Sequence, residues 1–177
     1  MIYWKKGNLL DSDCDYICQQ VNCQGRMGSG IAKQIKERWP VVYHDYMAKY
    51  NAVKELADEW AGQYEGGTPS ADEILLGDIQ IVGLWVDYYK DPIHQSVINM
   101  FAQQHYGYDG KRYTSYDAFW NCLNLIKQTV PTDKKIGFPY NIGCGLGGAN
   151  WMVILAMIDT VLKDHHVEIY TLEDEDE

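Results

Sequence analysis

Two glycine-rich segments are the places in this sequence where ligand chemistry is most easily built. They run from Gly25 to Gly30, here called the first loop, and from Gly143 to Gly148, the second loop. Each is expected to end a strand and open a helix, where backbone N–H groups can bind a phosphate. Glycine leaves the backbone open to that phosphate. One such loop could be an ordinary tight turn, but two in one small chain could hold a diphosphate from both sides.

Side chains beside the two loops would complete a ligand cleft. Asn22 ends an apolar strand directly before the first loop, which directs its amide toward the cleft. Bulky side chains are absent at positions 28–30, and apolar side chains surround the second loop. The residues expected to contact a ligand in this cleft are Asn22, Gly28, Ser29, Gly30, Ile31, Ile142, Gly143, Cys144, Gly145 and Leu146.

Other glycine motifs fit the sequence less well. Gly143, Gly145 and Gly148 match the G-x-G-x-x-G pattern of dinucleotide-binding Rossmann domains. That pattern opens a βαβ unit near the start of a larger domain, whereas only one strand is expected after it here. Neither loop continues into Gly-Lys-Ser or Gly-Lys-Thr, which excludes a P-loop. The cysteines and histidines lack metal-ligand spacing, so neither a metal site nor a cofactor is expected.

Reactive side chains near the loops have two interpretations each. Cys23 and Cys144 lie inside or beside the loops, where a helix N-terminus could favour a thiolate nucleophile. No His–Asn or His–Asp partner is identifiable, and small thiols also suit tight packing. His105 lies in the polar segment 103–114, which could fold over the ligand and supply a proton carrier. The same segment could equally be a solvated connection.

The elements that must position these loops alternate along the chain. Helices are expected over Ser29–Arg38, Pro40–Asn51, Thr114–Val130 and from the cap Asn150 to Leu162, with His165 and His166 closing the last one. A surface loop is expected over 57–73 and a turn at 90–92. The alternation of strands and helices along the chain predicts an α/β sheet covered by helices on both faces, with ligands beyond the carboxyl ends of its strands. The expected strands are Ile2–Lys5, Tyr16–Val21, Ile79–Val86, Ser96–Ala102, Lys135–Phe138 and Val167–Leu172.

Length and charge restrict the class of protein. The 177 residues suit one domain over 1–172, followed by an acidic tail over 173–177 that should be solvated and disordered. The net charge of −10 argues against nonspecific nucleic-acid binding but leaves a small anionic ligand possible. Five cysteines without a C-x-x-C pair suggest reduced thiols, and no long apolar run is present. We expect a cytoplasmic monomer that does not associate with membranes.

The loop sequences resemble a known family. Residues 22–32 read Asn-Cys-Gln-Gly-Arg-Met-Gly-Ser-Gly-Ile-Ala and are similar to the first ligand loop of macro domains, in the branch that contains terminal ADP-ribose glycohydrolase and the yeast ADP-ribose 1''-phosphate phosphatase. Residues 139–151 resemble the second loop of that branch. Agreement extends to Gly7-Asn8-Leu9, Leu76-Gly77 and residues 167–172, so the resemblance covers nearly the whole chain.

The resemblance implies a fold and a ligand. The fold would be a three-layer α/β/α macro domain with a mixed six- or seven-stranded sheet between helices. The ligand would be ADP-ribose or a derivative, including an ADP-ribosylated macromolecule. Its adenine would lie near Asp15 and Tyr170, its diphosphate on both loops, and its distal ribose near Asn22. A carboxylate can accept a hydrogen bond from the adenine amino group, and a tyrosine ring can stack on the base.

Catalysis is where the sequence departs from the family. The resemblance to the glycohydrolase implies attack by a lysine helped by an aspartate in the second loop. In this sequence residues 99–103, where the lysine would be, contain no lysine, and Gly147 stands at the aspartate position. Gln19 stands where the phosphatase has a histidine, and glutamine can orient water but cannot carry the proton. Three hypotheses stay open: a 1''-phosphate phosphatase with Asn22 and Gln19 as catalytic residues, a non-catalytic ADP-ribose binder, or removal of ADP-ribose from macromolecules without a lysine.

Overall fold

The structure is a computed structural model that describes residues 1–61, 63, 67–84 and 95–172. The end of the strand expected to reach Val86, the expected turn at 90–92 and the acidic tail lie outside these residues. Within them, no helix combines the length and apolar character that a bilayer crossing requires.

A six-stranded mixed sheet forms the centre of the molecule. Its order is β1-β6-β5-β2-β4-β3, and only β3 runs antiparallel to its neighbour. The carboxyl ends of the parallel strands therefore meet at one edge of the sheet. The expectation of a mixed sheet of six or seven strands is confirmed. The strands are β1 Ile2–Lys6, β2 Tyr16–Asn22, β3 Ile79–Leu84, β4 Gln95–Gln103, β5 Lys135–Pro139 and β6 His166–Thr171.

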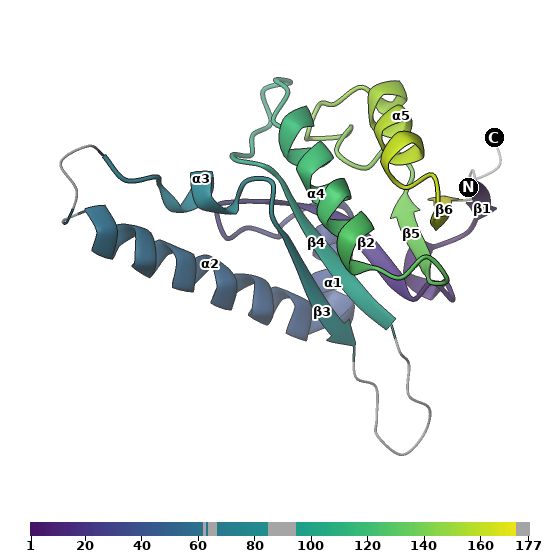
Figure 1. Cartoon of the computed structure of the whole chain (residues 1–177), viewed down its shortest axis with the longest axis horizontal. Coiled ribbons are helices and arrows are strands. Elements are labelled where there is room, and N and C mark those ends of the chain that lie inside the picture. Colours follow the sequence, from purple (N-terminus) through teal and green to yellow (C-terminus); the bar gives the residue numbers. More distant parts are fainter. Residues whose placement is uncertain (62, 64–66, 85–94, 173–177) are drawn as a thin grey trace, which may run out of the picture.

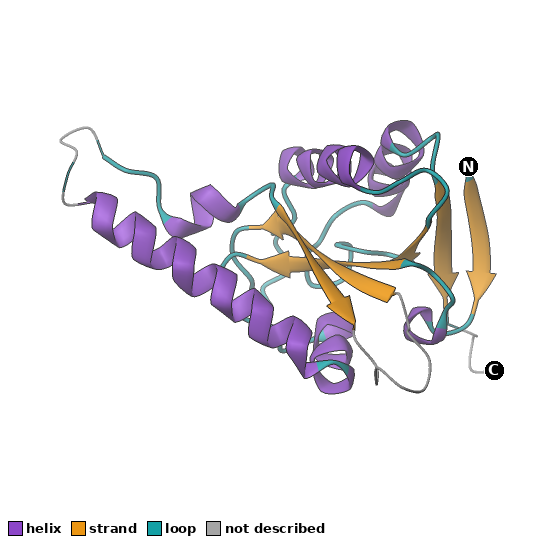
Figure 2. Ribbon diagram, turned by 60° about the horizontal axis from the view of Figure 1, so that its bottom comes forward, coloured by secondary structure: helices purple, strands orange, loops and turns teal. Residues whose placement is uncertain are grey.

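Helices cover both faces of the sheet, as expected from the alternation of elements. Figure 2 shows the sheet between one pair of helices and the long helix on the other side. Strand side chains alternate between two cores, so that Ile17 packs with α1 and α2 while Cys18 packs with α4 and α5. The helices are α1 Gly30–Arg38, α2 Pro40–Ala61, α3 Ala71–Leu75, α4 Tyr116–Thr129 and α5 Trp151–Val161, with a 3-10 turn η1 over Leu9–Asp11.

Helix α2 is ten residues longer than the sequence analysis predicts. It continues past Asn51 to Ala61, and this second half extends beyond the sheet (Figure 1). The apolar stripe that marks a packed helix ends near Tyr50, but good helix formers and the Lys54–Asp58 pair continue the helix. The expected loop over 57–73 also holds the start of α3, whose Ser70 and Glu73 form a capping box.

Two helix ends also differ from the prediction. Ser115, and not Thr114, caps α4, because the Ser115 side chain accepts from the Ala118 N–H. The pair His165–His166 does not close a helix, since α5 ends at Val161 and His166 begins β6. The ring of buried His165 lies 3.0 Å from the Val130 carbonyl oxygen, which places it in the core. The cap predicted at Asn150 is confirmed: its side chain accepts from the Met152 N–H at 2.9 Å.

Candidate functional site

Three adjoining cavities form one cleft along the edge where the parallel strands end. The β6 cavity, of about 500 Å³, lies between Asn8, Ile31 and Tyr170. The loop cavity, of about 390 Å³, lies between the two glycine loops and shares Ile31 and Tyr140 with the β6 cavity. The outer cavity, of about 350 Å³, shares five residues with the loop cavity. Together they offer an elongated site for a ligand of several linked groups.

The charge of the cleft is opposite to that of the whole protein. Its charged lining residues in the described part of the chain are Lys6, Arg26 and Lys36, and no carboxylate joins them. The chain as a whole carries a net charge of −10. A local concentration of cations in an acidic protein favours an anionic ligand at that place.

The first loop ends at an open helix N-terminus. Ser29 caps α1 through its backbone, and its side chain makes no cap hydrogen bond. The first helical bond joins the Lys33 N–H to the Ser29 carbonyl at 3.2 Å. The N–H groups of residues 30–32 have no acceptor within the described ranges. An anion in the loop cavity could accept from these groups.

Asn22 shapes the first loop and has little freedom to reach into the cleft. Its Oδ1 accepts from the Gln24 and Arg26 N–H groups, and its Nδ2 donates to the Arg26 carbonyl at 2.8 Å. The buried Tyr46 hydroxyl lies 3.0 Å from the same Oδ1 and accepts from the Arg26 N–H. Burial raises the pKa of Tyr46, so this hydroxyl stays protonated. The small exposed part of Asn22 lines the outer cavity.

The second loop is held against the segment before α4. The N–H groups of Tyr113 and Thr114 both donate to the Gly147 carbonyl at 2.9 Å, and the Thr114 hydroxyl donates to the Gly143 carbonyl. A Cβ at Gly147 would overlap the Gly143 oxygen and the Thr114 hydroxyl. The local backbone therefore leaves no room for an aspartate there. Asn150 already caps α5, so this loop offers free N–H groups at 145–147 and no open helix end.

Gln20 lies in the cleft, whereas Gln19 does not. Gln20 lines both the loop and outer cavities, and its Nε2 donates to Gln103 Oε1 at 2.7 Å and to the Thr114 hydroxyl at 2.8 Å. Gln19 is fully buried on the α2 side, where its Nε2 donates to Asn99. Its assignment as a catalytic residue is therefore corrected. Alternation along the strand, counted from Ile17 and Cys18, would have indicated the neighbour.

The structure does not bring Asp15 to Tyr170. Asp15 precedes β2, at the end of that strand opposite Asn22, and its carboxylate accepts from the Lys135 N–H and the Lys134 ammonium. Tyr170 does line the β6 cavity, whose lining also includes the polar residue Asn8. The placement of Asp15 beside adenine is corrected for this reason. Asn8 lies two residues after the end of β1, and β1 pairs in parallel with β6, which places Asn8 at the same edge of the sheet as Tyr170.

The predicted loop residues otherwise meet at the cleft, with one exception. Gly28, Ser29, Gly30 and Ile31 line it from the first loop, and Ile142, Gly143, Gly145 and Leu146 line it from the second. Cys144 is absent from the lining and packs against the core beneath α4 and α5.

The candidate nucleophiles and proton carriers lie outside the lining. Burial raises the pKa of Cys23 to about 12, and it also raises that of Cys144. His105 Nδ1 is 2.8 Å from Gln24 Nε2 on the surface. Among the residues the structure describes, no group of three or more His, Cys, Asp or Glu side chains could hold a metal ion.

Comparisons with known proteins give short sequence matches and several structural ones. No family model matches the chain. Over 46 residues it is 44% identical to the DNA ADP-ribosyl glycohydrolase of Mycobacterium tuberculosis, a segment that covers 26% of this chain and 13% of that protein. DarTG of Thermosipho africanus in complex with ADP-ribose superposes with a TM-score of 0.69 at 18% identity, over 98% of this chain and 42% of that one.

The macrodomain of Thermus aquaticus DarG superposes with a TM-score of 0.66 at 21% identity, over 97% of this chain and 98% of that one. The two superpositions, both under 25% identical, establish a shared fold, and the one with the Thermus aquaticus macrodomain spans nearly all of both chains.

Proposed function

We propose that this chain, which has the macrodomain fold, binds ADP-ribose or a derivative of it along the cleft. The observation that carries the proposal is the row of three linked cavities with free backbone N–H groups at its centre. ADP-ribose is itself a row of a base, two phosphates and a terminal ribose. The structural neighbour from Thermosipho africanus is a complex with ADP-ribose, which supports the same ligand here.

Each part of the ligand has a chemically suitable cavity. The adenine would lie in the β6 cavity between Ile31 and Tyr170, where an aromatic face and an aliphatic side chain can enclose a base. The diphosphate would accept from N–H groups at 30–32 and 145–147 in the loop cavity. The distal ribose would lie in the outer cavity beside Gln20 and Asn22.

We further propose that binding proceeds without rapid turnover. Residues 99–103, where the resembling glycohydrolase has its lysine, contain no lysine, and Gly147 stands at its aspartate position. Neither place therefore supplies a side chain that transfers a proton near neutral pH. The ionisable groups of the described cleft lining are lysines, an arginine and tyrosines. The mycobacterial relative acts on ADP-ribosylated DNA, and the same reaction here would need a proton carrier from elsewhere.

Hydrolysis of ADP-ribose 1''-phosphate is the second candidate. Arg26 and Lys36 line the outer cavity, where a phosphate on the distal ribose would lie. Gln20 and Gln103 could orient a water molecule toward it. Phosphate release from this substrate, compared with a protein-free control, decides between the two. If no phosphate is released, the protein only binds ADP-ribose. If phosphate release saturates with increasing substrate, the protein is a phosphatase.

Substitutions at two glycines test the cleft itself. A Cβ at Gly28 or Gly145 would meet nothing within 4 Å, and neither residue has a left-handed backbone, so the fold should tolerate a side chain. Gly28→Val and Gly145→Val would nevertheless cover the free N–H groups. We expect calorimetric titration to show about tenfold weaker ADP-ribose binding for each, or about 1.4 kcal/mol. Ala156→Val, exposed on α5, is the control. Unchanged affinity in both glycine variants contradicts the proposed cleft.

A further inference from the structure

A buried carboxylate lies beneath the β6 cavity, and the proposed function gives it no role. Glu168 is in the middle of β6 and its side chain is 2% exposed. It does not line the cavity, but Tyr170, two residues along the strand, does. Residues two apart on a strand share a face, so Glu168 and Tyr170 point to the same side of the sheet.

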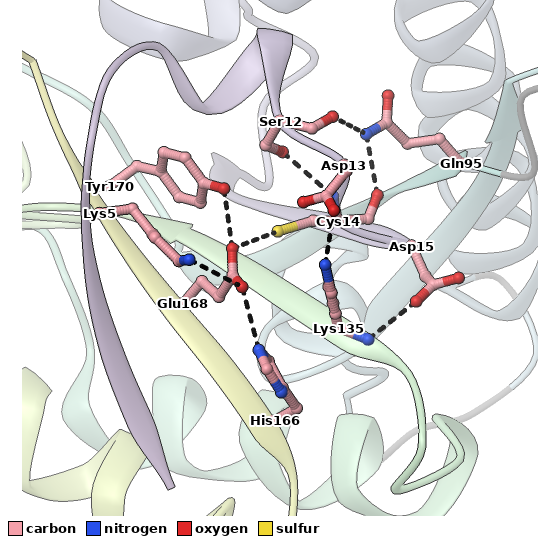
Figure 3. A network of polar contacts seen from close by, with 10 residues as sticks. All are labelled: Lys5, Ser12, Asp13, Cys14, Asp15, Gln95, Lys135, His166, Glu168 and Tyr170. Carbon is pink, nitrogen blue, oxygen red and sulfur yellow. Dashed lines mark hydrogen bonds and ion pairs between the residues drawn. The ribbon is translucent and has the colours of Figure 1, made fainter.

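Donors surround both oxygens of this carboxylate (Figure 3). The Tyr170 hydroxyl donates to Oε2 at 2.7 Å, and the Cys14 thiol donates to the same oxygen at 3.5 Å. Oε1 lies 3.0 Å from His166 Nε2 and 3.8 Å from Lys5 Nζ. The partners come from β1, from β6 and from the connection between η1 and β2. One side chain thus joins three segments behind the cavity.

The contacts fix the direction of each hydrogen bond. Burial acts to raise the pKa of Glu168, but hydrogen bonds from His166 and Tyr170 and the charge of Lys5 outweigh it and hold the pKa below its usual value. The group is therefore a carboxylate at neutral pH and can only accept. Burial, together with the carboxylate, raises the pKa of Tyr170, which keeps its hydroxyl proton in place as the donor.

The Cys14 contact links Glu168 to a second residue of the cavity lining, Leu9. Burial raises the pKa of Cys14 to about 11, so the thiol keeps its proton and donates. A Cβ at Gly137 would come within 2.9 Å of the Cys14 sulfur and would also overlap a methyl group of Leu9. Cys14 and Leu9 are thus packed tightly on β5, and Leu9 lines the β6 cavity with Tyr170.

We propose that Glu168 is a positioning residue for the base-binding end of the cleft. It holds the Tyr170 ring, through the hydroxyl, in the orientation that receives the base, and it links that ring to the segment that carries Leu9. The inference rests on the proposed function. A buried carboxylate is costly compared with an apolar side chain, and its retention is accounted for by this fixed geometry.

If Glu168 only stabilised the fold, the loss of any of its partners should change ADP-ribose affinity equally. A partner that lies away from the cavity therefore provides a control. Glu168→Gln removes the charge, and Tyr170→Phe removes the hydroxyl. His166→Gln alters another partner of the same carboxylate on the side away from the cavity, and it can still donate. The wild-type protein is titrated with ADP-ribose first. A wild type that fails to bind overturns the proposed function and leaves the geometry around Glu168 unchanged.

With a wild type that binds, we expect Glu168→Gln and Tyr170→Phe each to weaken ADP-ribose affinity about tenfold, the scale of a lost charged hydrogen bond. The double variant should be no weaker than the Tyr170→Phe variant, because both substitutions act on the same link. His166→Gln should stay within about twofold of wild type. Additive losses, an equal loss in His166→Gln or unchanged affinity in Glu168→Gln overturns the inference. If Glu168→Gln does not fold, Tyr170→Phe with its His166→Gln control decides in the same way.

Discussion

At the scale of single residues, the Tyr46 hydroxyl is the link between the first loop and the core. It lies 2.8 Å from the Asn22 carbonyl oxygen and accepts from the Arg26 N–H at 3.0 Å. Its ring stacks on Phe101 of β4, with centroids 5.8 Å apart. The loop that would bind the diphosphate is therefore shaped by a residue that never contacts the ligand.

Removing that hydroxyl should loosen the loop. We expect Tyr46→Phe to lower the free energy of unfolding by about 1–2 kcal/mol, because buried backbone groups of Asn22 and Arg26 lose a partner. ADP-ribose binding should weaken as well. Urea unfolding and titration measure the two effects, with Tyr50→Phe on the same helix, outside the lining of the cleft, as the matched control. A Tyr46→Phe protein as stable as the control would contradict this role.

The same scale shows what the sequence could not supply. The loop glycines were predicted because a lack of side chains after a strand opens the backbone to an anion, and Ile31 was predicted because it follows them at the start of a helix. Asp15 and Gln19 were misplaced because residue type alone does not say which end or face of β2 a side chain occupies. Asn8 becomes identifiable only once the β1–β6 pair is known, whereas alternation along β2 already separates Gln20 from Gln19.

At the scale of elements, the second loop and the segment before α4 form one packed unit. The Gly147 carbonyl oxygen accepts hydrogen bonds from two N–H groups of that segment, and Gly148 lies against the backbone of Lys111 and Arg112. A glycine at position 147 is thus a requirement of the local packing. The missing aspartate is a property of this loop conformation as well as of the sequence.

An aspartate at position 147 should therefore destabilise the second loop. We expect Gly147→Asp to lower the free energy of unfolding by about 1–3 kcal/mol through overpacking. Gly145→Ala, where a Cβ meets nothing within 4 Å, should stay close to wild type. Chemical denaturation compares the two variants. A stable Gly147→Asp protein that binds ADP-ribose would show that the loop can open.

The elements themselves were largely predictable, and the failures have a common cause. Every strand that the structure describes was expected from runs of apolar residues that end at glycine, proline or polar turns. The extent of α2 and the presence of α3 were missed, because both depend on helix propensity and capping without a buried stripe. A periodic apolar pattern indicates which residues are buried, so it reveals a helix only where one face of that helix is buried.

At the scale of the whole molecule, the buried carboxylate couples stability to pH. The folded-state pKa of Glu168 lies below its unfolded value, which is about 4.3. Its contribution is thus fully present above that value and is lost as the pH falls through the folded pKa. We expect the stability difference between wild type and Glu168→Gln to narrow on acidification below about pH 4. Urea midpoints at pH 7 and pH 3.5 measure it; a constant difference would contradict the assignment.

The overhang of α2 divides that helix into two parts. Val42 and Tyr46 are fully buried in its first half, whereas Ala57 is the buried residue of α2 beyond position 50. Backbone amides in the second half should exchange with deuterium through local fraying, and those near Tyr46 only when the whole domain opens. The first loop is hydrogen-bonded to the half of α2 that should exchange slowly. Fraying of the second half should therefore leave the first loop in place, because the contacts to Asn22 and Arg26 come from Tyr46.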